Sequence, residues 1–376
     1  MADRGVFSVE KSAGPPTKRT WSAVDYALGL LGFMITSAAF VMILDYKRIQ
    51  GSISLWVSLE QPDFFRPSPD EVLFVRRTLV KGAAAKGAVC LDGTPPAYHL
   101  HRGKGLGAKN WLIHIEGGGW CSTSETCFRR SGTRLGSSHH MEEQVVFGGS
   151  LSNSPLKNPD FYNWNRVKVR YCDGGSFSGD IDSPLEVKLD KVNQSKLIYF
   201  RGRRIWQAVM DDLLSLGLKH AKKALLSGCS AGALASMIHC DDFRKQLPDN
   251  AVVKCISDAG FFVDVRDVMN KATIQSFYRD VVSLHGMAPQ LSASCTRGDK
   301  CIFPQYLVRG IKTPLFVLNA AYDTWQVSHK CNEFHCMILS FNVFRNAMEV
   351  TNSVFTKKIP HLSMRISFEG LFVIFK

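Results

Sequence analysis

The segment at residues 228–232, GCSAG, places a serine between two glycines in the order G-x-S-x-G. A short apolar stretch precedes it and an alanine-rich stretch follows, so Ser230 lies at a predicted strand-to-helix turn. Such a turn presents the serine hydroxyl as a nucleophile, and its crowded backbone requires small neighbours. The N–H of Ala231, at the start of the helix, would face an oxyanion. The pattern predicts a serine nucleophile for acyl transfer. The alternative is a chance match in a chain with 30 glycines.

A glycine run, EGGGWC at residues 116–121, directly follows another predicted strand at 111–115. Backbone N–H groups in such a run, at Gly118 and Gly119, can converge on an anion and form the second arm of an oxyanion hole. An ordinary tight turn is the alternative. The run lies about 110 residues before the predicted nucleophile, and each segment strengthens the interpretation of the other.

A third candidate is Asp323, in the segment NAAYDTWQ that follows a predicted strand at residues 315–318. The chain order serine, aspartate, histidine is that of α/β-hydrolases, so Asp323 is predicted to orient a histidine base. A capping or turn aspartate is the alternative. The histidines that follow Asp323 are His329, His335 and His361. His335 is the candidate base, and the sequence leaves its identity open because geometry decides such roles.

Short apolar strands alternate with helices from about residue 71 onward. Strands are expected at residues 111–115, 167–171, 224–227, 252–257 and 315–318, and helices at residues 203–218 and 233–240. This alternation predicts an α/β fold with a mostly parallel sheet and helices on both faces. Sites in such sheets lie at the carboxyl ends of strands, where the glycine breaks occur.

An uncharged run at residues 26–44 is long enough to span a bilayer. Basic residues before it favour a cytosolic amino terminus. We therefore expect a cytosolic tail at residues 1–25, a transmembrane signal-anchor at 26–45 and a stalk at 46–70, with the remainder in the secretory lumen. A cleaved signal peptide and a buried core helix are the alternatives.

Composition excludes two broad classes of protein. Hydrophobic residues make up 45% of the 376 residues, which excludes a disordered chain. A polytopic membrane protein is excluded because only one stretch is long and apolar enough to span. The formal net charge of +13 fits an anionic partner such as an acidic glycan, or solubility alone. Nucleic acid is not expected as a partner, since the basic residues are dispersed.

Eleven cysteines fit an oxidising compartment. None forms a C-x-x-C pair, so a zinc ribbon is not indicated and no metal site is expected. Cys121 with Cys127, and Cys295 with Cys301, would close short loops, but connectivity stays open and an odd count leaves at least one thiol unpaired. Asn193 begins the sequon Asn-Gln-Ser and predicts a glycoprotein.

Five segments in this order resemble plant pectin acetylesterases, with the animal carboxylesterase Notum as a more distant relative of the same group. The segments are EGGGWC, YCDGGSFSGD (171–180), GCSAG, SDAGFF (257–262) and NAAYDTWQ. The resemblance implies a secreted, α/β-hydrolase-like enzyme of the cell wall that removes acetyl esters from homogalacturonan without a metal or cofactor. It covers about residue 70 to Gln326 and implies a hydrolase domain at 71–326.

The same resemblance assigns roles to individual residues. It implies Ser230 as nucleophile and Asp323 as the triad acid. It further implies an oxyanion hole around Gly118, Gly119 and Ala231, and it places Trp120 near the acyl pocket as a substrate-binding residue.

Residues 327–376 depart from the family pattern, with one glycine, one proline and seven phenylalanines. Family members place the catalytic histidine several tens of residues after the aspartate, whereas His335 follows Asp323 by twelve positions. We interpret 327–376 as an atypical tail, so activity is expected to be impaired if no histidine takes this role. The alternatives are a catalytically inactive, membrane-anchored glycan-binding protein and an esterase for a different acyl group.

Overall fold

The computed structural model describes residues 72–189, 193–267, 269–291, 295–320, 323 and 325–326, and the backbone of two strands at 363–366 and 371–375. The expected tail, signal-anchor and stalk at residues 1–70 lie outside these ranges, as does most of the predicted atypical tail. Within the described ranges, no helix is both long and apolar enough to cross a membrane.

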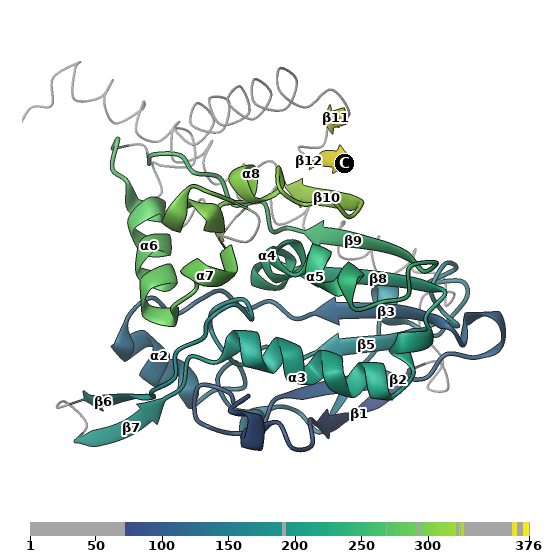
Figure 1. Cartoon of the computed structure of the whole chain (residues 1–376), viewed down its shortest axis with the longest axis horizontal. Coiled ribbons are helices and arrows are strands. Elements are labelled where there is room, and N and C mark those ends of the chain that lie inside the picture. Colours follow the sequence, from purple (N-terminus) through teal and green to yellow (C-terminus); the bar gives the residue numbers. More distant parts are fainter. Residues whose placement is uncertain are drawn as a thin grey trace, which may run out of the picture. The chain divides into compact units, whose positions relative to one another are not determined.

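A ten-stranded sheet forms the centre of the described domain (Figure 1). Its five central strands run parallel to one another: β5 (Asn165–Val169), β3 (Asn110–Ile115), β8 (Lys223–Cys229), β9 (Val252–Asp258) and β10 (Leu315–Ala320). Antiparallel strands form both margins: β2 (Ala97–His101), β1 (Phe74–Leu79) and β4 (Gln144–Val146) beside β5, and β12 (Leu371–Phe375) and β11 (Ser363–Ile366) beside β10. The predicted α/β fold with a mostly parallel sheet is confirmed. The antiparallel strands at its two margins were not among the strands predicted from the sequence.

The register of the parallel strands brings three loops to one edge of the sheet. Ile115 at the end of β3 pairs with Gly228 in β8. Cys229 pairs with Asp258, and Asp258 pairs in turn with Leu318 in β10. The glycine run, the serine turn and the loop that carries Asp323 therefore begin at the same carboxyl edge.

Helices α3 (Gly202–Ser215) and α4 (Ala231–Ile238) contribute to the main hydrophobic core. Side chains alternate between the two faces of a strand, so Ile113 and Leu226 join Trp206 and Leu234 in this core. The predicted helix at 203–218 is confirmed with an earlier end. The helix expected at 233–240 begins two residues sooner, and a break at His239 separates it from α5 (Cys240–Lys245).

A separate cluster covers part of the opposite face of the sheet. Leu112 and Leu225 pack there with Phe147 and Leu151, and Trp164 lies against them. No member of this cluster belongs to an α-helix of the described chain. The expectation of helices on both faces therefore holds for one face only in the region that the structure describes.

Smaller elements surround this centre. The remaining α-helices are α2 (Ser124–Ser131), α6 (Thr273–His285), α7 (Ala288–Leu291) and α8 (Pro304–Leu307). Strands β6 (Leu185–Leu189) and β7 (Gln194–Ile198) form a separate hairpin, and the sequon residue Asn193 is exposed just before β7. Short 3-10 helices are η3 (Ala84–Lys86), η4 (Gly105–Gly107), η5 (Ser138–His140), η6 (Gly149–Leu151), η8 (Leu218–His220) and η9 (Gly298–Ile302).

Four disulfides cross-link segments within the described domain: Cys90–Cys172, Cys121–Cys127, Cys240–Cys255 and Cys295–Cys301. The two short loops expected from cysteine spacing are both closed. Cys229 is the free thiol among the described cysteines, and it is half-buried beside the predicted nucleophile.

Candidate active site

Ser230 lies at a strained turn between β8 and α4. Its backbone angles are φ 56° and ψ −123°, a conformation that residues with a side chain rarely adopt. Its N–H donates to the carbonyl of Asp258 at 2.9 Å. A Cβ on Gly228 would overlap the carbonyl oxygen of Gly232, and one on Gly232 would overlap that of Ile115. The turn therefore requires both glycines, as the sequence predicts for a nucleophile elbow.

The glycine run passes directly beside Ser230. A Cβ on Gly117 would lie 3.0 Å from the Cβ of Ser230, so side chains are excluded at this approach. Gly118 and Gly119 follow with φ of 148° and 66°, both in the region that favours glycine. Ala231, the first residue of α4, is adjacent to the serine. The structure thus brings together the residues expected to form an oxyanion hole.

Trp120 is tied to both the 171–180 segment and α4. Its Nε1–H donates to Ser176 Oγ at 2.8 Å, and Ser176 Oγ donates to the carbonyl of Ala231 at 2.8 Å. Asp173 holds this loop, because its Oδ2 accepts from the N–H groups of Gly175 and Phe177 at 3.0 and 2.9 Å. The 171–180 segment therefore braces the site, a role that the sequence did not reveal.

Aromatic rings pack edge-on around Trp120 next to the glycine run. The centroid of Trp120 lies 5.1 Å from that of Phe262, 5.1 Å from Trp325 and 5.2 Å from Tyr278. A Cβ on Gly119 would lie 3.9 Å from Trp325 Nε1, so this aromatic cluster borders the predicted oxyanion hole. Two of its members, Phe262 and Trp325, come from the other segments that carry the family resemblance.

Asp323 follows β10 at the same edge of the sheet. Its Oδ1 accepts the N–H of Gln326 at 2.8 Å, which is the contact that a turn aspartate makes. Burial, followed by the charges of Asp258 and Asp323, raises the pKa of the Cys229 thiol. Burial and then the charge of Asp323 likewise raise the pKa of Tyr278. The charge of Asp323 therefore contributes to the pKa of one residue of the elbow and of one residue of the aromatic cluster.

Histidine remains the missing member of the predicted triad. Among the residues that the structure describes, no histidine forms a hydrogen bond with Ser230 or Asp323. The candidates that follow Asp323 in sequence, His335 included, lie outside the described residues. The identity of the base therefore stays a prediction.

Two fully buried histidines have structural partners instead. His239, at the end of α4, stacks on Trp206 and places its Nε2 3.0 Å from the carbonyl of Phe177. His285, at the end of α6, places its Nε2 2.9 Å from the carbonyl of Cys121. Both contacts connect helices to the loops that brace Ser230, so these imidazoles act in the fold.

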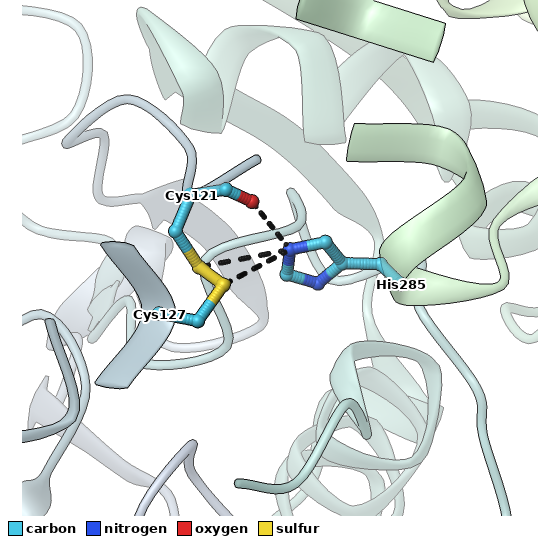
Figure 2. Close-up of side chains that lie close together, drawn as sticks. All are labelled: Cys121, Cys127 and His285. Carbon is cyan, nitrogen blue, oxygen red and sulfur yellow. Dashed lines mark hydrogen bonds between the residues drawn. A yellow bond between two sulfur atoms is a disulfide. The ribbon is translucent and has the colours of Figure 1, made fainter. Parts of the chain in front are cut away.

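Cys121, Cys127 and His285 form a cluster whose potential ligand atoms all lie within 4.8 Å of one another (Figure 2). The two sulfur atoms are joined in a disulfide, so neither is available as a thiolate. His285 Nε2 is engaged with the carbonyl of Cys121, directly after the glycine run. The oxidised cluster therefore does not fit a metal centre, and it anchors the end of that run.

A groove of about 600 Å³ lies elsewhere, at the amino ends of the parallel strands. Its lining includes Asn110, Lys223 and Val252, which begin β3, β8 and β9 or lie next to their starts. Ligand sites in parallel sheets occur at the carboxyl ends, where Ser230 lies. We therefore place the candidate active site at the serine turn.

Acid is expected to destabilise the domain through its buried imidazoles. Burial lowers the pKa of His114, His239 and His285 to about 4, whereas burial raises the pKa of Asp173 to about 6. Between pH 6.5 and 4 the unfolded chain binds more protons on these histidines, so each removes ~3 kcal/mol of stability as the pH falls. Protonation of Asp173 in the folded state returns ~2 kcal/mol over a similar interval.

Three such losses, less the return from Asp173, give an expected net fall in the free energy of unfolding on the order of 6 kcal/mol from pH 7 to pH 4. Urea denaturation at each pH measures it. His285→Gln keeps a donor for the Cys121 carbonyl but does not titrate, and it should flatten the pH dependence by about half. An unchanged slope in this variant would contradict the assignment.

Comparison with known proteins identifies one family. The family described as Pectinacetylesterase matches residues 68–348, a range that runs past Gln326. Pectin acetylesterase 7 of Arabidopsis thaliana is 51% identical over 255 residues, covering 67% of this chain and 63% of that protein. Pectin acetylesterase 5 of the same plant is 48% identical over 316 residues, 83% of this chain and 70% of that protein. The resemblance to pectin acetylesterases is thereby confirmed.

Animal proteins are similar at lower identity. Palmitoleoyl-protein carboxylesterase NOTUM of Mus musculus is 31% identical over 259 residues, 64% of this chain and 49% of that protein. The crystal structure of the Wnt deacylase Notum from Drosophila superimposes with a TM-score of 0.64 at 24% identity, covering 75% of this chain and 82% of that one. This second match confirms the fold. The chain spans 63% of the length of the first plant relative.

Proposed function

Because the chain belongs to the pectinacetylesterase family, we propose that it is a serine carboxylesterase that removes acetyl groups from the homogalacturonan of cell-wall pectin. The observation that carries this proposal is the strained Ser230 turn with the glycine run packed beside it. A nucleophile elbow and a row of backbone N–H groups are what ester hydrolysis by a serine requires.

In the proposed reaction, Ser230 Oγ attacks the acetyl carbonyl while a histidine accepts its proton. The N–H groups of Gly118, Gly119 and Ala231 stabilise the negative charge on the carbonyl oxygen. The sugar hydroxyl leaves with the proton, and water then hydrolyses the acetyl-serine to release acetate. Asp323 orients the histidine, for which His335 is the candidate. No step requires a metal or a cofactor.

The aromatic cluster supports a small acyl group. The rings of Trp120, Phe262, Tyr278 and Trp325 pack against one another beside the glycine run, with neighbouring centroids 5.1–6.4 Å apart. This packing fills the space beside Gly119 with side chains that hold one another in place. An acetyl group fits such a site, whereas a long acyl chain requires the rings to separate.

We further propose a secreted or lumenal location. Four disulfides suit an oxidising compartment, and the exposed Asn193 fits a glycoprotein. The net charge of +13 suits an anionic polygalacturonate. Attachment to a membrane through residues 26–45 is a prediction from sequence alone. The second candidate is an inactive glycan-binding protein, which an assay of acetate release separates from an esterase.

The experiment is to incubate the full chain with acetylated pectin and, separately, with a palmitoleoylated peptide, and to measure the acid released. We expect acetate release above that of a Ser230→Ala blank, and at least about 10-fold lower turnover of the long ester. Equal, background-level acetate release from both proteins would instead support the inactive alternative. Faster release of the long acid would indicate an esterase for a different acyl group.

A further inference from the structure

Two side chains hold the carbonyl groups of the glycine run. Arg130, in α2, donates from Nη1 to the carbonyl oxygen of Gly118 at 2.9 Å. Tyr171, just after β5, donates its hydroxyl proton to the carbonyl oxygen of Gly119 at 2.8 Å. The Gly118 carbonyl belongs to the peptide that carries the N–H of Gly119, one of the groups expected to face the reacting ester, and the Gly119 carbonyl belongs to the next peptide.

A hydrogen bond that fixes a peptide carbonyl also fixes the direction of the N–H in the same peptide. The C=O and N–H of a trans peptide point in opposite directions within one rigid plane. Fixing the Gly118 carbonyl therefore fixes the N–H of Gly119, and fixing the Gly119 carbonyl fixes the N–H of Trp120. Neither glycine has a Cβ to restrict the rotation of these peptides. Their orientation has to come from hydrogen bonds.

Further contacts restrain the Arg130 side chain and the helix that carries it. Its Nε donates to the carbonyl of Leu135 at 3.0 Å, and its guanidinium lies 5.0 Å from the ring centroid of Tyr171. Helix α2 is capped by Thr123, and the Cys121–Cys127 disulfide joins the helix to the end of the glycine run. Arg130 thus acts from a helix that is covalently linked to the loop it holds.

The hydroxyl of Tyr171 has its donor direction fixed by a second contact. It accepts the N–H of Ser176 at 3.0 Å, so its own proton is directed to the carbonyl of Gly119. The side chain is completely buried, and burial raises the pKa of its hydroxyl, so the donor stays protonated. Glu116 accepts the backbone N–H of Tyr171 at 3.1 Å and joins it to the start of the glycine run.

We propose that Arg130 and Tyr171 are positioning residues for ester hydrolysis: they hold the Gly118 and Gly119 carbonyls and so aim the N–H groups of Gly119 and Trp120 at the oxyanion. This inference rests on the proposed function and extends that function in two ways. It assigns a role to two side chains that do not touch the substrate. It also adds the N–H of Trp120 to the predicted oxyanion hole.

The test uses Arg130→Gln and Tyr171→Phe in the full chain, with a matched control for each. Arg129→Gln changes the neighbouring arginine of α2, which is exposed and paired with Glu125 at 2.8 Å. Tyr98→Phe removes the hydroxyl of another buried tyrosine, which donates to Asp212 at 2.8 Å. Acetate release gives kcat and KM for each variant, and thermal unfolding shows which variants are folded.

We expect kcat to fall about 10- to 100-fold in both test variants, with KM changed less than about 3-fold, because oxyanion contacts strengthen only in the transition state. Binding of a trifluoromethyl ketone, which forms a tetrahedral oxyanion on the serine, should weaken by the same factor. Arg130→Lys retains a donor and should recover part of kcat. The two controls should stay within about 2-fold of the unaltered chain.

Three results would overturn the proposal: unchanged kcat in a folded Tyr171→Phe variant, equal losses in the controls, or a loss confined to KM. If the unaltered chain releases no acetate, the proposed function fails separately. The positioning role is then tested by the rate at which a fluorophosphonate labels Ser230, since its phosphoryl oxygen enters the same site. Equal labelling rates in the unaltered chain and both test variants would overturn it there as well.

Discussion

Replacing Ser230 with alanine is expected to lower acetate release from acetylated pectin by about 10⁴- to 10⁶-fold, to the level of the uncatalysed reaction plus weak binding effects. The substitution removes only the attacking oxygen. Alanine keeps the Cβ of serine and can adopt the same backbone angle, φ 56°, so the turn and the orientation of the nearby N–H groups are retained. Initial rates of acetate release at saturating pectin measure the effect.

Ser215→Ala is the matched control for this prediction. Ser215 ends α3, is exposed, and donates its hydroxyl to the carbonyl of Asp212 at 2.7 Å, away from the sheet edge that carries the site. We expect its rate to stay within about 2-fold of the unaltered chain. Full acetate release by Ser230→Ala would exclude the serine mechanism. A much smaller loss, on the order of 10-fold, would indicate that no histidine base serves Ser230 in this chain.

Removing the Cys90–Cys172 disulfide with a pair of serines is expected to have the largest effect on stability, a loss of ~4.5 kcal/mol in the free energy of unfolding. The loop-closure estimate is large because 82 positions separate the two cysteines. Both are fully buried, and Cys172 lies between Tyr171 and Asp173. Activity should fall as well, since both neighbours brace the glycine run or the loop beside it.

Urea denaturation measures this loss, and the Cys295–Cys301 pair is the matched control. Its cysteines are six positions apart, for which the same estimate gives ~2 kcal/mol. Equal losses from the two substitutions would contradict the loop-length argument. A Cys90–Cys172 variant that loses stability but keeps full kcat would show that the braced loops hold their geometry without this bond.

The central strands could be predicted from sequence because their signals are local. Strands β3, β8 and β10 are short apolar runs that end at glycine or at a turn, so composition alone marks them. The marginal strands were missed, because β1 carries two arginines and β2 two histidines. Their pairing depends on residues far along the chain: Arg77 pairs with His99, and Tyr98 with Val169. No local pattern encodes such contacts.

The same difference between local signals and long-range contacts applies to the site. The serine turn and the glycine run were predictable because only certain residue types tolerate that backbone, which restricts the sequence directly. Arg130 and Tyr171 were not singled out, since they act on backbone carbonyls from 12 and 52 positions away, and any nearby donor would serve. Membership of the YCDGGSFSGD segment, at the end of a predicted strand, was the available signal for Tyr171.

The register between β3 and β8 has an evolutionary consequence. Ile115 and Gly228 are ladder partners, and the two halves of the site leave the sheet immediately after them. Inserting or deleting one residue within either strand would turn every following side chain to the other face. Changes in length that keep this chemistry are therefore confined to loops beyond the paired positions, whereas the spacing across these two strands has to be kept.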